Sequence, residues 1–294
     1  MRSFCRKIFL RKVNERMAEY TVSASVVLYN GFDEAAGCIE SVLEKTTGVP
    51  LALYLIDNAS PDGSGEKLKE RFAGRAEVIC SPQNLGYGKG HNLCLEKLNS
   101  KYHAVINPDI VFGEDTLSRL CAYLDEHPDV VMVTPNILFP DGRVQRIAKR
   151  IPNVLALTAR QLPLGFLKPY ENHYLMLDRD LSQPQEIQFC TGCFFVIRTD
   201  VLKSFGGFDP DYFMYVEDAD ITRRAMRCGK VMYLPETYVY HRWHRAPTRR
   251  LKPFLMQLRS MLLYFGKWGF CFGFGKKAAC LPYNADIPAQ RPAE

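Results

Sequence analysis

Short hydrophobic runs alternate with amphipathic stretches along the first half of the chain. Runs rich in β-branched and aromatic residues predict strands at Val22–Tyr29, Leu51–Ile56, Glu77–Cys80 and His103–Ile106. Apolar residues at helical spacing predict helices between and after them, at Asp33–Glu44, Gly65–Phe72, Lys89–Leu98 and Asp115–Glu126. This alternation predicts an α/β fold with a mostly parallel central sheet flanked by helices.

The pattern changes in the second half. Strands are predicted at Val130–Leu138 and Ile187–Ile197, and a helix from about Glu217. Between these strands, residues 150–186 are irregular and rich in Pro, Leu and charge, so we expect an insertion there that could act as a lid.

A last amphipathic stretch covers residues 248–265, where seven apolar residues recur at helical spacing: Leu251, Phe254, Leu255, Leu258, Met261, Leu262 and Phe265. This pattern fits a helix on a membrane surface and equally a helix packed on the domain. The chain contains no run of about 18 uncharged apolar residues, so we do not expect a membrane-spanning helix.

Charge is unevenly distributed around a net value of +6. Residues 1–16 carry six basic residues and one acid, and residues 242–277 carry nine basic residues and no acid, which leaves the remainder at −8. Basic ends on an acidic body suggest that the ends meet an anionic surface. The amphipathic stretch favours a membrane leaflet, so we expect no nucleic-acid partner.

The composition, 47% hydrophobic and 24% charged over 294 residues, is ordinary for one large globular domain with appendages. The ten cysteines are mostly isolated in apolar runs, and no secretory signal precedes them. We therefore expect reduced thiols in the cytosol. Cys190 and Cys193 form one C-x-x-C pair, but no second pair follows, so core packing is favoured over a zinc site.

Polar residues gather where the predicted strands end. The strand ends continue as Tyr29-Asn30, as Asp57-Asn58-Ala59-Ser60, toward Asn84-Leu85-Gly86, and as Asn107-Pro108-Asp109. Ligands of open α/β sheets bind beyond the carboxyl ends of the strands, so this repeated placement predicts a binding site. The glycines at 86, 88 and 90 follow the third strand rather than the first, which argues against a nicotinamide-binding fingerprint.

Eight ordered blocks between Val22 and His241 resemble the family 2 inverting glycosyltransferases of the GT-A fold, in particular their rhamnosyltransferase-like branch. The blocks are Val26-Val27-Leu28-Tyr29-Asn30, Asp57-Asn58-Ala59-Ser60, Asn84-x-Gly86-Tyr87-Gly88-x-Gly90-x-Asn92, Asn107-Pro108-Asp109, Thr191-Gly192-Cys193, Gly206-Gly207-Phe208-Asp209, Phe213-x-Tyr215-x-Glu217-Asp218-x-Asp220 and His241. The resemblance implies a GT-A domain at 21–241, between a basic segment at 1–20 and a basic amphipathic extension at 242–294.

The resemblance also implies roles for single residues. Asn30 and Asp57 would hold the nucleotide base, and Asn84 and Gly86 would line its pocket. The wider set for the nucleotide sugar adds Tyr29, Ser60, Asn92 and Asn107. Asp109 would hold a divalent cation, Mg²⁺ or Mn²⁺, with His241 as a further ligand or diphosphate contact. Asp218 would be the general base, with Glu217 in support and Gly192, Phe213 and Tyr215 on the acceptor side.

One position departs from the family pattern, because Asn107 replaces the first of the two acids that many GT-A enzymes carry in the metal motif. Mg²⁺ needs only one or two carboxylates beside substrate phosphates, so a cation remains expected. Two other functions stay open. A sugar-1-phosphate nucleotidyltransferase would need a basic glycine-rich loop after the first strand, where Tyr29–Asp33 has no basic residue. A non-catalytic sugar-nucleotide-binding protein would not need Asp109 and Glu217-Asp218 together.

The resulting hypothesis is an inverting transferase that moves L-rhamnose from dTDP-rhamnose, or else a hexose from a UDP-sugar, to a hydroxyl of a lipid-linked or growing cell-surface glycan. We expect it in the cytoplasm, peripherally bound to the inner face of a bacterial plasma membrane. The sequence leaves its oligomeric state open.

Overall fold

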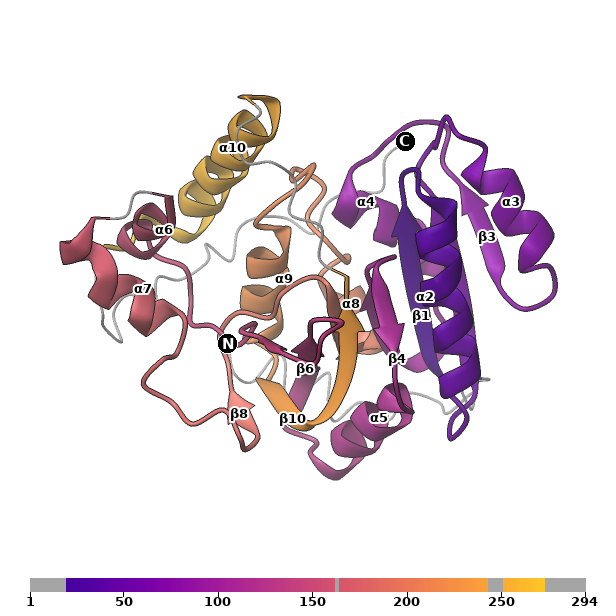
Figure 1. The fold of residues 1–294 in the computed structure, drawn as a ribbon, viewed down its shortest axis with the longest axis horizontal. Helices are drawn as coiled ribbons and strands as arrows, with labels where there is room; N and C mark the ends of the chain where they lie inside the picture. The colour runs from indigo at the N-terminus through magenta and orange to yellow at the C-terminus, as the bar shows by residue number, and fades with distance from the viewer. Residues whose placement is uncertain (1–19, 162–163, 243–250, 273–294) are drawn as a thin grey trace.

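The structure, a computed structural model, describes residues 20–161, 164–242 and 251–272. The predicted basic segment at 1–20 therefore lies outside the described residues, except for Tyr20, and so do parts of the extension at 242–294. The ten described strands form one sheet. Its main path has the order β3-β2-β1-β4-β9-β6-β10-β5, and helices lie on both sides of it (Figure 1).

The first half of the sheet is parallel, as the sequence predicts. It consists of β1 (Tyr20–Leu28), β2 (Leu51–Asp57), β3 (Glu77–Cys80) and β4 (Ser100–Ile106). Leu28 is in register with Asp57, and Asp57 with Cys80. The carboxyl ends of these strands therefore meet at one edge of the sheet, where their polar loops come together.

The second half of the sheet is mixed, which the sequence does not reveal. Its main strands are β9 (Phe194–Arg198), β6 (Val130–Leu138), β10 (Lys230–His241) and β5 (Ile110–Phe112). β9 runs antiparallel to both β4 and β6, whereas β10 runs parallel to β6. The short strands β7 (Val144–Gln145) and β8 (Gln185–Glu186) pair with β6 and β10. β9 is buried almost throughout, so its continuous apolar run looks like that of a parallel strand.

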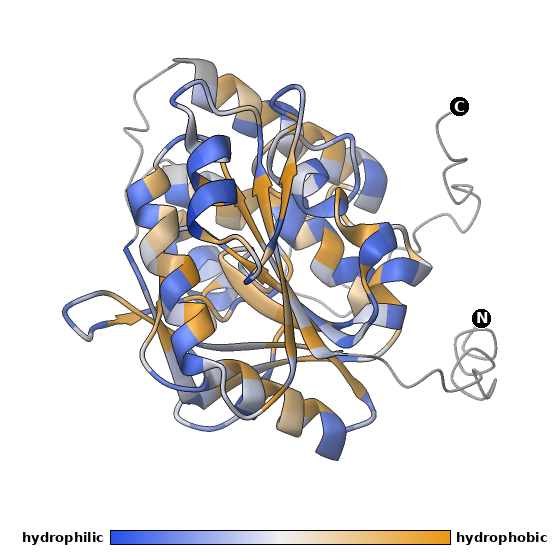
Figure 2. Cartoon of the chain, turned by 90° about the vertical axis from the view of Figure 1, so that its right-hand side faces the viewer, coloured by the Kyte–Doolittle hydropathy of each residue, from blue (hydrophilic) through white to orange (hydrophobic). Residues whose placement is uncertain are grey.

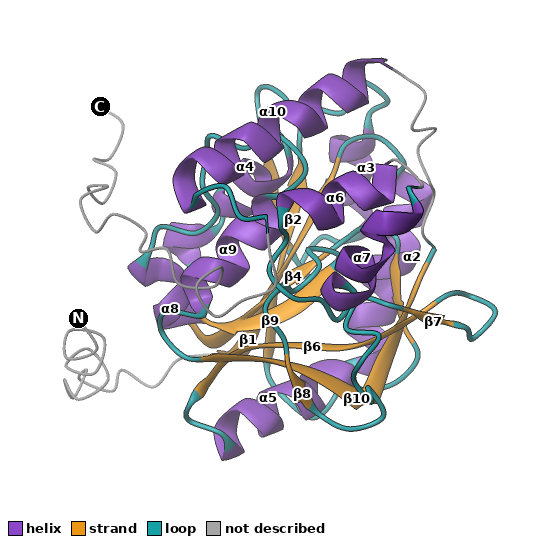
Figure 3. Cartoon of the chain, turned by 90° about the vertical axis from the view of Figure 1, so that its left-hand side faces the viewer, coloured by secondary structure: helices purple, strands orange, loops and turns teal. Residues whose placement is uncertain are grey.

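The helices cover the two faces of the sheet (Figure 3). They are α2 (Phe32–Lys45), α3 (Ser64–Arg71), α4 (Tyr87–Asn92), α5 (Thr116–Glu126), α6 (Val154–Gln161), α7 (Lys168–Tyr174), α8 (Thr199–Ser204), α9 (Glu217–Ala225) and α10 (Leu251–Trp268), with short 3₁₀ turns at Leu95–Lys97 and Gly165–Leu167.

Three predicted elements differ in extent. The predicted helix Lys89–Leu98 is divided into α4 and a 3₁₀ turn, and the predicted strand Ile187–Ile197 is a strand only from Phe194. The stretch 150–186, predicted to be irregular, contains α6, α7 and a 3₁₀ turn between them.

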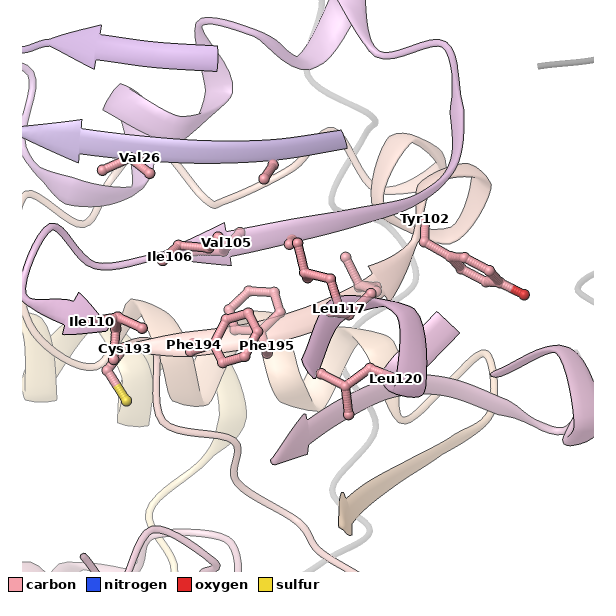
Figure 4. Close-up of a cluster of buried hydrophobic side chains, with 14 of the residues drawn as sticks. Val26, Tyr102, Val105, Ile106, Ile110, Leu117, Leu120, Cys193, Phe194 and Phe195 are labelled. Atoms are coloured by element: carbon pink, nitrogen blue, oxygen red, sulfur yellow. The ribbon is translucent and has the colours of Figure 1, made fainter. Parts of the chain in front are cut away.

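The main core fills the space between the sheet and the helices. Leu117 and Leu120 of α5 face Phe194 and other side chains of β9 and β4 (Figure 4). The ring of Phe194 meets that of Phe112 edge-on, with the centroids 5.2 Å apart. Figure 2 shows the same division by hydropathy, with hydrophobic strands inside and polar surfaces on the helices.

A second, smaller core joins the C-terminal helix to the domain. Tyr264, Phe265 and Trp268 of α10 are buried in it with residues of α6, α7 and α9. The opposite face of α10 exposes Phe254, Leu255, Leu258 and Leu262. The two interpretations of the amphipathic pattern thus concern different faces of one helix. Among the described residues, none of the helices combines the length and apolarity that crossing a membrane requires.

Candidate active site

The loops after β1 and β2 bring four of the predicted nucleotide-binding residues together. The backbone N–H of Asn30 donates to Ser60 Oγ at 2.8 Å, and the N–H of Ser60 donates to Asp57 Oδ1 at 3.3 Å. Asn30 has a φ of 63°, a left-handed conformation that Asn tolerates better than most residues. Tyr29 beside it is half exposed, so its ring is accessible to a ligand.

Asn58 organises the turn that holds Asn84 and Gly86. Its side-chain amide donates to Asn84 Oδ1 at 3.2 Å and to the carbonyl of Gly86 at 3.0 Å, and its Oδ1 accepts the N–H of Leu85 at 2.9 Å. Asn58 belongs to the block Asp57-Asn58-Ala59-Ser60, but the sequence predicts no role for it. These three hydrogen bonds fix the turn that carries Asn84 and Gly86.

Gly86 lies against the acceptor-side loop. It has a φ of 83°, and a Cβ placed on it would be only 2.1 Å from the carbonyl oxygen of Phe213. The N–H of Tyr87 donates to that same oxygen at 2.9 Å. Only glycine fits this close approach, so the donor-side turn and the loop that carries Phe213 are in direct backbone contact.

Asn92 is hydrogen-bonded to the backbone of Phe208. Its Nδ2 donates to the carbonyl of Phe208 at 2.7 Å, and its Oδ1 accepts the N–H of Phe208 at 2.8 Å. Both ends of the amide thus hold the turn at residues 206–208. The side chain of Asn92 thus has a structural role, and its contact with the nucleotide sugar stays a prediction.

Asn107, Asp109 and His241 lie together at the junction of β4, β5 and β10. Asp109 Oδ2 is 3.2 Å from His241 Nε2. Asn107 Oδ1, Asp109 Oδ1 and His241 Nε2 are all buried, and none has a hydrogen-bond partner among the described residues. Buried polar atoms are normally satisfied, so this group of unpartnered oxygen and nitrogen atoms fits a divalent cation. A cluster of three or more acidic, His or Cys ligands does not occur in the described part of the chain.

Gln145 fixes the orientation of His241. Its Oε1 lies 2.9 Å from His241 Nδ1, and its Nε2 donates to the carbonyl of His241 at 2.9 Å. Because the amide nitrogen of Gln145 donates to the backbone, its oxygen faces the ring and can accept a hydrogen bond from Nδ1, and this pairing directs Nε2 toward Asp109. No sequence signal identified Gln145, because it comes from β7, far from the motif of Asp109.

Glu217 and Asp218 open α9, immediately after two strained residues. Tyr215 and Val216 have φ values of 72° and 68°, and positive φ is costly for a β-branched residue such as Val216. Asp218 Oδ2 accepts the N–H of Gly192 at 3.1 Å, and its Oδ1 accepts the N–H of Ala219 at 2.9 Å. Tyr87 donates to the carbonyl of Gly192 at 2.5 Å. The strained turn and these bonds fix where Asp218 lies.

The two carboxyl groups have different environments. Burial and the neighbouring Asp218 raise the pKa of Glu217 to about 8. Burial also raises the pKa of Asp218, but Lys149 and the N–H groups of Gly192 and Ala219 act in the opposite direction. Glu217 Oε2 is buried without a hydrogen-bond partner among the described residues. The support expected from Glu217 thus has no hydrogen bond at this oxygen in the described part of the chain, and Glu217 is buried whereas Asp218 is only partly so.

Two successive residues connect the two groups of polar side chains. Gly192 donates to Asp218, and the carbonyl of Cys193 accepts the N–H of Asn107 at 2.8 Å. The predicted catalytic and metal-binding residues thus lie on either side of one short segment.

The sequence of the chain matches the model of a known protein family. The family is described as glycosyl transferase family 2, and the match covers residues 23–206. The chain belongs to this family.

The curated relatives of this family 2 protein include two rhamnosyltransferases. It is 27% identical over 220 residues to the N-acetylglucosaminyl-diphospho-decaprenol L-rhamnosyltransferase of Mycobacterium tuberculosis. The aligned region covers 69% of this chain and 70% of the relative. It is 24% identical over 198 residues to the rhamnosyltransferase WbbL of Escherichia coli K12, and this alignment covers 62% of this chain and 70% of the relative. The protein is therefore a glycosyltransferase, as the sequence predicts.

Solved structures of other glycosyltransferases share its fold. GalNAc-T7 with UDP, GalNAc and Mn²⁺ aligns with a TM-score of 0.64 at 16% identity, over 85% of this chain and 49% of that one. Staphylococcus aureus TarS 1-349 with UDP-GlcNAc aligns with a TM-score of 0.55 at 19% identity, over 83% and 65%. The chain spans about half the length of GalNAc-T7. These matches confirm the predicted GT-A fold.

Proposed function

We propose that this glycosyltransferase moves a sugar from a nucleotide diphosphate to a hydroxyl of a lipid-linked or growing cell-surface glycan, with inversion at the anomeric carbon. The observation that carries the proposal is the segment Gly192-Cys193, which holds Asp218 on one side and Asn107 on the other. L-rhamnose from dTDP-rhamnose is the first candidate donor, because two curated relatives are rhamnosyltransferases. A UDP-hexose is the second.

Asp218 is the group that takes the acceptor proton. A general base must be ionised and within hydrogen-bond reach of the hydroxyl. Lys149 and two backbone N–H groups favour the ionised form of Asp218, whereas Glu217 at a pKa of about 8 is mostly protonated near neutral pH. When their surroundings separate the pKa values of two neighbouring carboxyl groups, one can be ionised and act as the base while the other stays protonated. Phe213 and Tyr215, on the loop before α9, would contact the acceptor.

Asp109 and His241 are the residues that would hold a divalent cation, Mg²⁺ or Mn²⁺. The chemistry that such a cation supplies is neutralisation of charge on the departing nucleoside diphosphate. Gln145 keeps His241 Nε2 available, and Asn107 adds an unpartnered oxygen beside the pair. On the donor side, Asn30, Asp57 and Ser60 would receive the base, with Tyr29, Asn84 and Gly86 around it.

A membrane position suits an acceptor that is linked to a lipid. We place the enzyme at the cytoplasmic face of the plasma membrane, with the exposed apolar face of α10 toward an anionic leaflet. The basic residues of 242–277 support this placement, because basic groups near an anionic leaflet contribute about 1 kcal/mol each.

The test is an incubation with candidate nucleotide sugars, a divalent cation and lipid-linked acceptors. Transfer should release nucleoside diphosphate and invert the anomeric configuration, with the highest rate for dTDP-rhamnose. Release of pyrophosphate would identify a nucleotidyltransferase instead, and tight donor binding without turnover would identify a binding protein.

Asp57→Ala should mainly weaken donor binding, whereas Asp109→Ala should abolish turnover and its sensitivity to EDTA together. EDTA-sensitive turnover at the normal rate in Asp109→Ala would exclude Asp109 as a metal ligand.

A further inference from the structure

Gly192 is enclosed between the ring of Tyr87 and the side chain of Asp218. A Cβ placed on Gly192 would lie 3.1 Å from Cβ of Asp218 and 3.6 Å from Cε1 of Tyr87. The first distance is tighter than ordinary van der Waals contact, so a residue with a side chain would push against Asp218. Glycine suits this position, but it is also the residue whose backbone rotates most freely. The orientation of its peptide groups therefore depends on hydrogen bonds from other elements.

Three hydrogen bonds connect this short turn with α9, with α4 and with the loop after β4. The N–H of Gly192 donates to Asp218 Oδ2 at 3.1 Å, and the carbonyl of Gly192 accepts the Tyr87 hydroxyl at 2.5 Å. The carbonyl of Cys193 accepts the N–H of Asn107 at 2.8 Å. Gly192 is buried, so a carbonyl without its partner would be costly there. Tyr87 and Asp218 thus hold the two sides of the same glycine.

The ring of Tyr87 is itself held by the core. It meets the ring of His91 edge-on, with the centroids 4.7 Å apart, and that of Phe208 with the centroids 5.8 Å apart. His91 Nδ1 lies 2.7 Å from the hydroxyl oxygen of Ser25 in β1, which ties α4 to the sheet. Burial and the nearby Glu217 raise the pKa of Tyr87 well above its ordinary value, so the hydroxyl keeps its proton. Tyr87 is therefore a firmly placed hydrogen-bond donor.

Tyr87 also belongs to the donor side of the site. It is the first residue of α4 and directly follows Gly86, whose N–H donates to Asn84 Oδ1 at 2.9 Å. Its own N–H donates to the carbonyl of Phe213, on the loop before α9, at 2.9 Å. The backbone and the hydroxyl of this one residue thus connect the predicted nucleotide turn with both segments that lie beside Asp218.

We propose that Tyr87 is a positioning residue for the base, which holds the carbonyl of Gly192 so that the Gly192 N–H stays on the carboxylate of Asp218. This inference rests on the proposed function, in which Asp218 takes the acceptor proton, and adds a residue through which the donor side acts on that base. Without the hydroxyl, the backbone of Gly192 can rotate, and Asp218 loses part of the hydrogen bond that favours its ionised form. A displacement of about 1 Å at a catalytic group can slow a reaction about a hundredfold.

Several titratable groups lie near Asp218, and a test of Tyr87 should leave all of them in place. They are Lys149, Glu217, Cys190, Cys193, Tyr174 and Tyr264. Tyr87→Phe removes one uncharged hydroxyl, keeps the ring between His91 and Phe208, and changes none of these groups. A change in the pH dependence of Asp218 in this variant therefore reports on the hydrogen bond at Gly192.

The kinetic test compares Tyr87→Phe with Tyr54→Phe as a matched control. The hydroxyl of Tyr54 also donates to a backbone carbonyl, that of Lys97, at 3.1 Å, but away from the site. Tyr87→Phe should lower kcat roughly ten- to a hundredfold and change the KM for the donor by less than about twofold. The rise of kcat/KM should move to higher pH by about half a pH unit. Tyr54→Phe should lower Tm by a similar amount and leave kcat and the pH profile at their wild-type values.

Nuclear magnetic resonance gives a measurement that does not depend on turnover. In protein made with isotopically labelled glycine, the amide signal of Gly192 should shift with pH as Asp218 ionises. The midpoint of this shift should lie at higher pH in Tyr87→Phe than in the wild type, because the ionised carboxylate is less well held. The same midpoint in both proteins would overturn the inference. So would a loss of donor affinity in Tyr87→Phe, since Tyr87 would then contact the donor itself.

A double-mutant cycle separates this inference from the proposed function. In an Asp218→Asn background, Tyr87→Phe should lower the residual kcat by less than about twofold, since no base remains to be positioned. A reduction as large as that in the wild-type background would count against the inference. Normal turnover in Asp218→Asn alone would count against the proposed base, while the Gly192 signal would still decide whether Tyr87 governs the hydrogen bond at Asp218.

Discussion

Glu217 and Asp218 are neighbours in sequence, but their surroundings differ in a way that favours Asp218 as the proposed base. Asp218 accepts two backbone hydrogen bonds and lies near Lys149, whereas one oxygen of Glu217 is buried and unpartnered among the described residues. Asp218 must lose its proton to work, and burial raises its pKa. We therefore expect kcat/KM to rise with pH through a pKa above the ordinary carboxyl range.

Replacing each acid by its amide separates the two roles. Asp218→Asn should lower kcat by about 10²- to 10⁴-fold and leave donor affinity unchanged, because it removes the base and keeps its shape. Glu217→Gln should have a much smaller effect, since Glu217 is mostly protonated near neutral pH. The measurement is kcat for both variants, with folding checked by thermal melting. Turnover near the normal rate in Asp218→Asn would remove it from the mechanism.

Glu217 should also make stability depend on pH. Its pKa is about 8 in the folded protein against an ordinary value of 4.5, so between these values the folded state keeps a proton that the unfolded chain has released. The free energy of unfolding contributed by this group should therefore fall as pH rises from about 4.5 to about 8. Gln cannot ionise, so Glu217→Gln does not lose stability in this way. The difference between the Tm of Glu217→Gln and that of the wild type should therefore grow as pH rises across that interval.

The matched control is Glu66→Gln, which changes an acid whose side chain is 80% exposed. Its Tm should follow that of the wild type at every pH. A Glu217→Gln variant with the same pH dependence as the wild type would show that Glu217 is already ionised in the folded protein.

The order of the motifs predicts correctly where in the fold several residues lie, while their roles stay predictions. Asp57 and Asp109 are at the ends of strands, and Asp218 is in the first turn of a helix, as the sequence indicates. The motifs could not reveal Gln145 or Lys149, because each reaches its partner only after distant strands have paired. Helical periodicity also could not show that Glu217 is the less exposed of the two acids, since it gives the angle between side chains but not which neighbour covers them.

At the scale of elements, α10 holds α9, the helix that carries the proposed base, through a buried polar cluster. Asp220 of α9 is fully buried. It accepts a hydrogen bond from Trp268 Nε1 at 2.8 Å and forms an ion pair with Lys267 at 2.8 Å. Lys267 also binds Asp209 at 2.6 Å, and Arg224 pairs with Asp220 at 2.8 Å. Since Glu217 and Asp218 form the first turn of α9, this cluster anchors the helix that carries them.

Trp268→Phe tests that anchor with a small change. It removes the hydrogen bond to Asp220 and keeps an aromatic ring beside Arg223, whose Cζ is 4.4 Å from the Trp268 ring. The free energy of unfolding should fall by about 1.5–3 kcal/mol, the usual value of a hydrogen bond to a charged group. We also expect kcat to fall severalfold without a change in donor affinity, because α9 is held less firmly.

Tyr264→Phe is the control for packing at the same interface. It removes a bond from Arg223 to the Tyr264 hydroxyl at 3.2 Å and does not touch Asp220. Stability should fall in this variant while kcat is retained. If Trp268→Phe lowered stability and left kcat at the wild-type level, the cluster would be important only for folding.

At the scale of the whole molecule, the apolar face of α10 and the basic residues around it should bind anionic membranes. Leu258→Glu together with Leu262→Glu should reduce flotation with anionic liposomes, because it places charge in the exposed stripe. Binding of the wild type should weaken at high salt, since part of it is electrostatic. Val144→Glu, at an exposed apolar residue of β7, should leave flotation unchanged. Equal wild-type binding to neutral vesicles, or none to anionic ones, would contradict this placement.

The parallel half of the sheet could be predicted because strands and helices alternate in sequence there. The mixed half could not, because hydrophobic patterns show that β9 is buried but not in which direction it runs. The helices of 150–186 were missed for a related reason. Val154–Gln161 and Lys168–Tyr174 are short, and the residues they bury meet partners from α9 and α10, which lie much later in the chain.

The contact between Gly86 and Phe213 has a consequence for the order in which substrates bind. The donor-side turn at Asn84–Gly86 and the loop before α9 share the hydrogen bond from Tyr87 to Phe213. A nucleotide that binds at the turn should therefore fix the conformation of the loop before α9 before the acceptor binds. We expect a compulsory order with the donor first. Nucleoside diphosphate should then inhibit competitively against the donor and noncompetitively against the acceptor, whereas acceptor binding of equal strength to the free enzyme would indicate that the two loops act independently.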